Sequence, residues 1–317
     1  MYTKTNSTYC LQALFVLMVF LGTAFHTAAD TTTLSSGLLT LQYEPEQQQV
    51  AEQTMHILQD AMTEYAPLLP AGEQPIRVKI VSVADEFDQY AVNFTGLTVA
   101  GLARPNESLI VVKAPRLQMP GSDYYGTLRH ELVHLLVYRN VNPAFIPIWL
   151  NEGIAMSLAN ELRWQAMFQV ARMFIQGRII PYHKLDNAFL APSGQEQFGD
   201  AYGQALSMTR HLRNRLGDDK FWAVVLDMKN RPFPKALNET AGITIQQFWA
   251  EYERSLWKYA AIAAMASGFF FQPAAILLIL GYLRRRHIAK KLYQRWEQEE
   301  LEEAQEKGRI IYWEEVV

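Results

Sequence analysis

One segment of the 317-residue chain restricts its topology more than any other. Residues Tyr259 to Leu283 contain no charged side chain. A helix of that length, rising about 1.5 Å per residue, spans about 37 Å, which is enough for a tilted passage through a ~30 Å hydrocarbon core. The basic run Arg284–Arg286 follows directly and favours the cytoplasmic side. The pattern predicts a transmembrane helix over residues 258–283, and a buried core helix is the alternative.

A second apolar run, at the N-terminus, indicates export. It extends from Leu11 to Ala24, follows a short segment that carries Lys4, and precedes a run of small residues that ends at Ala29. This layout is typical of a secretory signal peptide over residues 1–29, with cleavage after Ala29. An uncleaved N-terminal anchor is the alternative.

These two segments together predict how the chain is divided. Residues 30–257 form an extracytoplasmic domain, periplasmic or extracellular, and residues 284–317 form a charged cytoplasmic tail. The formal net charge of −3 at pH 7 gives no basic field for nucleic acid, so we expect no nucleic-acid partner. The single cysteine, Cys10, allows neither an intramolecular disulfide nor a thiolate metal cluster. Any metal ion must therefore be bound by His, Asp or Glu.

The order of the expected elements places this domain in the α+β class. Residues 45–66 carry apolar side chains at helical spacing. Three strands are predicted after this helix, at Ile76–Val81, Leu97–Leu102 and Ser108–Lys113. From Pro120 onward the pattern is helical as far as the long apolar segment. We therefore expect a small mixed or antiparallel sheet followed by a mostly helical region.

Two histidines one helical turn apart carry the functional signal. His130, Glu131 and His134 form the pattern His-Glu-x-x-His. On a helix both imidazoles lie on one face, where they can bind a single ion. The neighbouring leucines form a different stripe, which would pack against the domain. The pattern predicts a zinc site, and the alternative is an exposed pair of histidines beside a solvated glutamate.

A catalytic zinc ion usually has three protein ligands and one open position. Glu152 is the expected third ligand, because a helix starting near Pro147 would return towards the histidines. The next candidate is Glu161, later on the same helix. We expect one Zn²⁺ ion, although Mn²⁺ or Co²⁺ would suit the same ligands.

Glu131 is then the expected general base. Zinc lowers the pKa of a water that it binds towards about 7, and a neighbouring carboxylate can take the proton and pass it to the leaving amine. This chemistry needs one carboxylate on the metal and one beside it. Glu152 and Glu131 fit those two positions.

The motif and its surroundings resemble a known family. His-Glu-x-x-His followed by Trp-x-x-Glu-Gly-x-Ala is the pattern of the gluzincin zinc metallopeptidases, which include thermolysin and the large zinc aminopeptidases, and it looks closest to the compact peptidase MA-like domains. The segment Ala201–Leu206 is similar to a downstream segment of those domains, so the resemblance covers roughly residues 75–255. It implies that His130, His134 and Glu152 bind zinc and that the glutamate between the histidines is catalytic.

The resemblance implies three further features. Tyr202 is the candidate for a hydroxyl group that stabilises an oxyanion, and a packing role is the alternative. The strand Ser108–Lys113 is expected to be the sheet edge on which an extended peptide or protein substrate pairs, and an ordinary sheet strand is the alternative. The Gly-x-Met-Glu-Asn motif of the aminopeptidases is absent, which favours an endopeptidase.

The sequence therefore predicts a membrane-anchored zinc metallopeptidase. A zinc-stabilised binding module without catalysis is the alternative, and the intact Glu131 argues against it. An intramembrane protease is a third reading. It is disfavoured because the charged residues Asp123, Arg129 and Arg139 surround the motif. The oligomeric state is left open.

Overall fold

A computed structural model describes residues 31–92, 97–159, 163–266, 277–287 and 289–290. The expected signal peptide and most of the expected tail lie outside these residues. The chain divides into two compact units. Unit 1 comprises residues 1–166 and 180–249, and unit 2 comprises residues 167–179 and 250–317.

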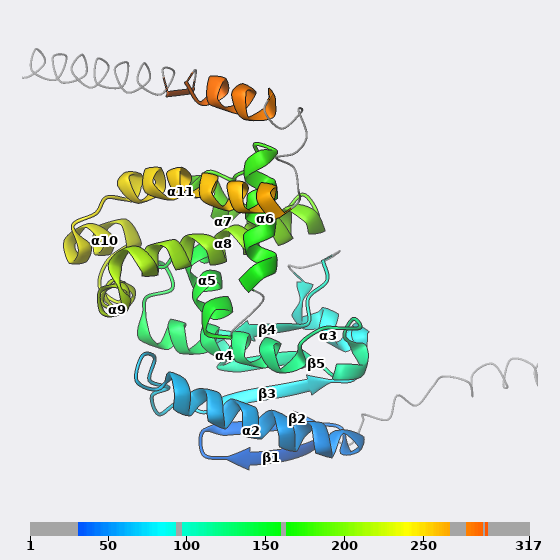
Figure 1. The fold of residues 1–317 in the computed structure, drawn as a ribbon. Helices are drawn as coiled ribbons and strands as arrows, with labels where there is room; N and C mark the ends of the chain where they lie inside the picture. The colour runs from blue at the N-terminus through cyan, green and yellow to red at the C-terminus, as the bar shows by residue number, and fades with distance from the viewer. Residues whose placement is uncertain (1–30, 93–96, 160–162, 267–276, 288, 291–317) are drawn as a thin grey trace, which may run out of the picture. The chain divides into compact units, whose positions relative to one another are not determined.

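Unit 1 begins with a five-stranded sheet of strand order β1-β2-β3-β5-β4 (Figure 1). The strands are β1 (Thr32–Ser36), β2 (Leu39–Tyr43), β3 (Ile76–Val81), β4 (Gly101–Arg104) and β5 (Leu109–Lys113). β2, β3 and β5 run parallel, and each outer strand is antiparallel to its neighbour. The predicted α+β class and mixed sheet are confirmed.

The strands follow the alternation of apolar residues. In β3 the alternate residues Ile76, Val78 and Ile80 are buried, while Arg77 between them is exposed. The first two strands were not predicted, although Leu39–Tyr43 alternates in the same way. β1 and β2 form a short hairpin at the start of the domain, so the sheet has five strands rather than the three that were predicted.

The prediction that Ser108–Lys113 is the sheet edge is wrong. This segment forms β5, which pairs with β3 on one side and with β4 on the other. Its side chains are buried along nearly its whole length, as is typical of an interior strand. The hairpin through Pro105–Glu107 folds β4 back along the outside of β5, so β4 is the edge strand.

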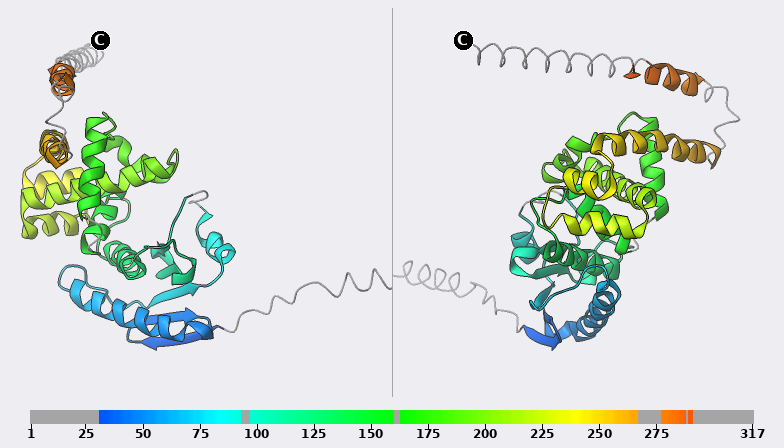
Figure 2. Two further views of the ribbon diagram at one scale, coloured as in Figure 1. Left: turned by 45° about the vertical axis from the view of Figure 1, so that its right-hand side comes forward. Right: turned by 90° about the vertical axis from the view of Figure 1, so that its left-hand side faces the viewer.

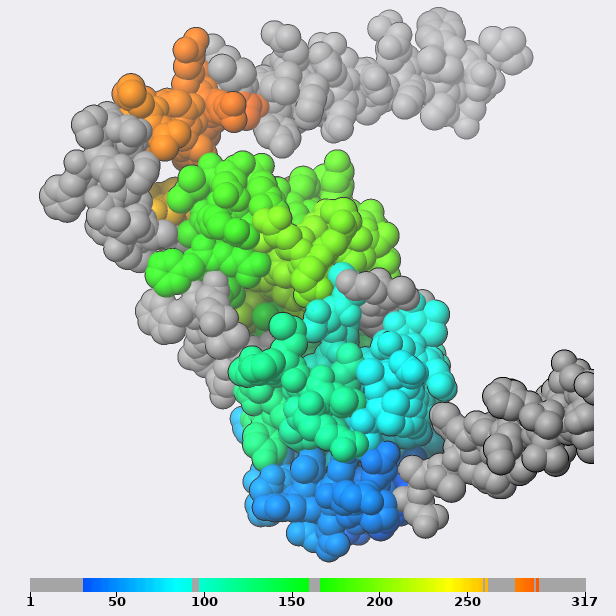
Figure 3. Space-filling model, turned by 90° about the vertical axis from the view of Figure 1, so that its right-hand side faces the viewer, coloured from blue at the N-terminus to red at the C-terminus, as the bar shows by residue number. Residues whose placement is uncertain are grey.

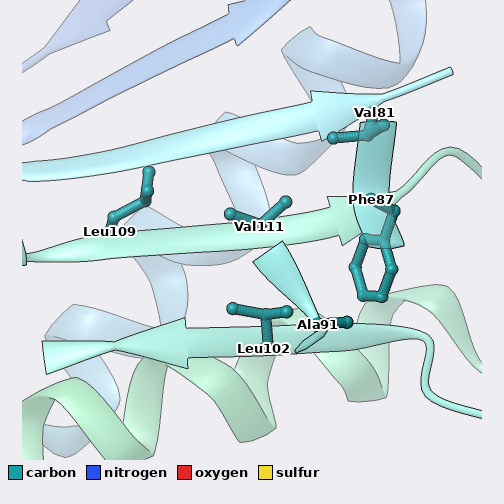
Figure 4. Close-up of a cluster of buried hydrophobic side chains, with 6 residues drawn as sticks. All are labelled: Val81, Phe87, Ala91, Leu102, Leu109 and Val111. Atoms are coloured by element: carbon teal, nitrogen blue, oxygen red, sulfur yellow. The ribbon is translucent and has the colours of Figure 1, made fainter. Parts of the chain in front are cut away.

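Helices cover both faces of the sheet. α2 (Gln48–Tyr65) lies along β1 and β2, and α4 (Tyr124–Asn140) contacts β4 and β5 (Figures 1 and 2). α3 (Ala84–Tyr90) covers the opposite face. Figure 4 shows its cluster of buried side chains, formed by Val81, Phe87, Ala91, Leu102, Leu109 and Val111. α4 therefore lies against β4 on the face of the sheet opposite to α3.

Further helices follow α4. They are α5 (Ile148–Leu158), α6 (Arg163–Ile175), α7 (Tyr182–Leu190), α8 (Gln195–Leu216), α9 (Asp218–Asp227), α10 (Phe233–Ala241) and α11 (Ile245–Ala266). α5 contacts α4, α7 and α8, and so it lies at the centre of the helical part of unit 1. The segment before β4 reaches the start of α8, where the Thr98 amide donates to the side-chain oxygen of Gln195 at 3.1 Å. In Figure 3 the cyan and yellow-green surfaces meet in this region.

Gly153 lets α5 approach α8 closely. A Cβ atom at this position would lie 2.0 Å from Thr209 Oγ1 and 2.7 Å from the Ala205 carbonyl oxygen. A rotation of Thr209 cannot relieve the second contact, because it involves main chain. The small residue is therefore required by the distance between the two helices.

No helix among the described residues is both long enough and apolar enough to cross a membrane. The transmembrane segment predicted over residues 258–283 is described only at its two ends: α11 ends at Ala266, and residues 277–287 are helical. Residues 267–276 lie outside the described part. Within unit 2, the ring of Tyr282 packs edge-on against Phe174, with 5.2 Å between centroids.

Gly153→Ala should destabilise the protein by about 1–3 kcal/mol, because the added methyl group overpacks the contact between α5 and α8. The measurement is the free energy of unfolding from urea titration. Ser157→Ala, on the same helix, is the matched control and should change the stability by less than about 0.5 kcal/mol. Equal stabilities of Gly153→Ala and the wild type would contradict the close contact.

Candidate metal centre

α4 and α5 bring three potential ligands together in unit 1. The Nε2 atoms of His130 and His134 lie 3.3 Å and 3.5 Å from Oε2 of Glu152. One nitrogen or oxygen atom from each of the three residues lies within 4.8 Å of the others. Both imidazoles are buried, and their centroids are 4.7 Å apart. The structure thus brings the three predicted ligands to one point.

The distances between these atoms fit a bound metal ion. Ligand atoms about 2.0–2.2 Å from a tetrahedral centre lie about 3.3–3.6 Å from one another. The two measured separations of 3.3 Å and 3.5 Å fall in this range. Two imidazoles and one carboxylate also leave a tetrahedral ion one position for water or substrate. The group formed by His130, His134 and Glu152, called the trio below, could therefore hold a metal ion.

The electrostatics of the trio couple its members. Burial alone lowers the pKa of His134, but the charge of Glu152 and the hydrogen bond to it outweigh this effect, so the pKa is raised. Burial alone would raise the pKa of Glu152. The charges of the two histidines and the hydrogen bonds to them outweigh this effect, so the pKa of Glu152 lies well below its usual range. Glu152 is therefore an anionic ligand at neutral pH.

Glu131 lies beside this trio and faces the edge strand. Its side chain is buried. A Cβ atom at Gly101 of β4 would lie 3.1 Å from Glu131 Cγ and 3.4 Å from its Oε1. The glutamate is not among the three grouped ligands. The structure thus places a carboxylate against β4, close enough to His134 for its charge to raise the pKa of that imidazole.

Sequence reasoning missed Gly101. A Cβ atom at this position would also lie 2.8 Å from Thr127 Cγ2 on α4, so only glycine allows β4 to approach α4 this closely. A glycine within a strand often marks such a close approach of backbone, and this was the available signal. It indicates a point at which α4 comes close to β4.

Tyr202 lies next to the metal trio, on α8. Its ring centroid is 6.5 Å from that of His130. The rings of Phe189 and Phe198 pack edge-on against it at 5.1 Å and 4.9 Å. The aromatic contacts hold the ring in place beside the metal ligands. The other candidate ligand, Glu161, lies outside the described residues.

Trp149 anchors the helix that carries Glu152. Its ring is buried, stacks on Phe248 with 6.1 Å between centroids, and meets Phe233 edge-on at 5.5 Å. The sequence motif contains this tryptophan three residues before the glutamate. Its contacts with Phe233 of α10 and Phe248 of α11 hold the first turn of α5 in place.

Comparison of the sequence with models of known protein families gives no match, and comparison with curated proteins gives none either. The fold and the site together define an α+β domain with a candidate metal centre of two histidines and one glutamate.

Zinc should bind more weakly as the pH falls from about 8 to about 6. Because the pKa of His134 is raised above its usual value near 6.5, the metal-free imidazole keeps its proton to a higher pH, and zinc must displace that proton. The apparent Kd can be measured by competition with a chromogenic chelator. His56→Gln, at an exposed site on α2, should leave the pH dependence unchanged. A Kd that stays constant over this range would contradict the prediction.

Proposed function

We propose that this chain is a gluzincin-type zinc metallopeptidase, an endopeptidase that hydrolyses peptide bonds. One observation carries the proposal: the buried carboxylate of Glu131 lies beside the three grouped ligands and against the open sheet edge. A metal ion that only stabilises a fold does not require a second carboxylate beside its ligands. An enzyme needs it where substrate, water and metal meet.

The side chains of His130, His134 and Glu152 would hold the ion. When bound, zinc supplies Lewis acidity towards the substrate carbonyl and lowers the pKa of water. The anionic Glu152 and the two neutral imidazoles give the ligand set that hydrolytic zinc sites use. Burial of the imidazoles limits the access of bulk water to their nitrogens.

Glu131 would move the proton. Its carboxylate accepts a proton from the attacking water and donates it to the nitrogen of the leaving amine. Its burial next to His134 keeps this transfer within a site shielded from bulk water. Gly101 opposite the carboxylate leaves room for a substrate backbone to pass close to it.

β4 is the strand on which the substrate would pair. No strand occupies its outer edge in the described part of the chain, and its other edge pairs with β5. An extended peptide added to this edge would lie alongside α4, with its main chain near Glu131. Main-chain pairing accepts many sequences, which suits a peptidase that acts on peptides or unfolded protein segments.

Tyr202 would donate its hydroxyl group to the oxyanion that forms at the carbonyl. The position of its ring beside His130 supports this role, because the donor has to approach the reacting carbonyl from the metal side. Phe189 and Phe198 would hold the ring in that orientation.

The proposed location is the outer face of a membrane, with one C-terminal span. The sequence supports it through the uncharged segment Tyr259–Leu283 and the arginines that follow. In the described helix over residues 277–287, the apolar side chains Leu277, Leu278 and Leu280 are exposed. Exposed leucines of this kind suit contact with lipid.

Glu131→Gln should abolish peptide cleavage and keep zinc binding. The amide cannot accept the proton, so turnover should fall by about a hundredfold or more, while the zinc ligands are unchanged. Cleavage of a fluorogenic peptide library and the zinc content of the purified protein are the measurements. Glu52→Gln, an isosteric change on the exposed side of α2, is the control. If the wild type binds zinc and cleaves nothing, the chain is the non-catalytic binding module instead.

Gly101→Ala should lower kcat/KM by about ten- to a hundredfold and leave the zinc affinity unchanged. The added methyl group would meet Thr127 Cγ2 and push β4 away from Glu131. The double variant Gly101→Ala/Thr127→Ser should recover part of the activity. Serine removes Cγ2 and retains the hydroxyl that donates to the Asp123 carbonyl oxygen. Thr127→Ser alone is the matched control, and wild-type activity of Gly101→Ala would exclude β4 as the substrate strand.

A further inference from the structure

The first turn of α5 is capped by a residue from another helix. Pro147 precedes the helix and provides no side-chain cap. The Asp186 carboxylate, on α7, accepts a hydrogen bond from the Trp149 amide at 3.0 Å and also one from the Ile148 amide. These amides belong to the first turn of the helix, where no intrahelical acceptor is available. Asp186 therefore provides the N-terminal cap of α5 that Pro147 does not provide.

The charge of Asp186 suits this position. A carboxylate near a helix N-terminus is stabilised by the partial positive charge of the free amides. Asp186 is partly buried, and this burial raises its pKa although the two backbone hydrogen bonds lower it. A carboxylate removed from water gains more from such bonds than an exposed one would. The hydrogen bonds of Asp186 thus form a partly buried polar contact between α7 and α5.

A second polar contact ties the same helix to α4. The Asn151 side-chain amide donates to the Tyr138 hydroxyl at 3.3 Å. Tyr138 lies one turn after His134, on the same face of α4. Burial raises the pKa of Tyr138, and the charges of Glu152 and Asp186 raise it further. Asn151, which directly precedes Glu152, is therefore fixed to the helix that carries the histidines.

On the histidine side of the site, His134 has less support of this kind. His134 Nδ1 is buried and has no hydrogen-bond partner among the described residues. In metal sites the other ring nitrogen of a ligating histidine usually donates to a polar group that orients the ring. Because His134 lacks such a partner, the meeting of its Nε2 with Glu152 Oε2 depends on how α4 and α5 are placed.

We propose that Asp186 is a positioning residue for the metal centre. By capping α5 from α7, it fixes the height and rotation of this helix, and hence the place of the Glu152 carboxylate three residues after Trp149. The inference rests on the metal binding within the proposed function, and it does not depend on peptidase activity. Asp186 itself does not contact the ion or the substrate.

The test compares the zinc affinity of Asp186→Ala and Asp186→Asn with that of the wild type. Asp186→Ala removes both hydrogen bonds and should weaken zinc binding by about ten- to a hundredfold. Asp186→Asn keeps an oxygen that can accept from the Trp149 amide, so it should recover a large part of the affinity. The apparent Kd is measured by chelator competition, and Tm is recorded with and without zinc.

Thr244→Ala serves as the matched control. Thr244 caps α11, where its Oγ1 accepts from the Gln247 amide at 3.2 Å and its own amide donates to Gln247 Oε1 at 3.0 Å. Loss of this cap should lower Tm in both states and leave the zinc Kd unchanged. For Asp186→Ala, the increase in Tm that zinc produces should be smaller than in the wild type.

The outcomes separate the two proposals. If Asp186→Ala lowers Tm as the control does and binds zinc with wild-type affinity, Asp186 is only a structural cap and the inference is overturned. If Asp186→Ala does not fold, Asp186→Leu takes its place, because leucine is close to aspartate in size and cannot accept a hydrogen bond. Wild-type zinc affinity of Asp186→Leu with a lowered Tm would also overturn the inference. A wild-type protein that binds zinc and cleaves no peptide refutes the peptidase while the result for Asp186 stands.

Discussion

The packing of α5 between α4 and α8 is the contact on which the rest of the structure depends. Gly153 lets the two helices α5 and α8 approach to the limit set by the Ala205 carbonyl. This closeness places Glu152, the preceding residue, where its carboxylate meets two imidazoles from α4. The aromatic anchor at Trp149 and the cap from Asp186 act on the same helix. The arrangement of the candidate metal ligands therefore depends on the relative positions of α4, α5 and α8, although the ligands themselves belong only to α4 and α5.

Much of the site could be predicted because part of it is local. His130 and His134 are four residues apart, and helical periodicity alone puts both on one face. Glu152 was predicted from its place in a motif, and the structure brings it to the histidines. Gly101 could not be assigned in this way, since its neighbours on α4 are remote in sequence. The role of Asp186 depends on α7 folding back onto α5, which no periodicity reveals.

The sheet shows the same division between local and remote information. The pattern of Ile76–Val81 predicted β3 with its observed bounds, because alternation is a property of the strand itself. Strand order is not a property of any single strand. β4 and β5 form the expected hairpin, but which of them joins β3 depends on long-range pairing, so the predicted edge was wrong. The hairpin of β1 and β2 was missed, although β2 alternates clearly.

The length of the edge strand has a consequence for what the site can accept. β4 has four residues and ends at the charged Arg104. A short edge that ends in a charge discourages two copies of the domain from joining their sheets, which protects an exposed strand from aggregation. If β4 is the strand on which a substrate pairs, as we propose, its four residues would limit main-chain pairing to a few peptide units. Under that proposal, a compact folded protein would first have to expose an unpaired segment, so the short edge would favour flexible regions of a substrate.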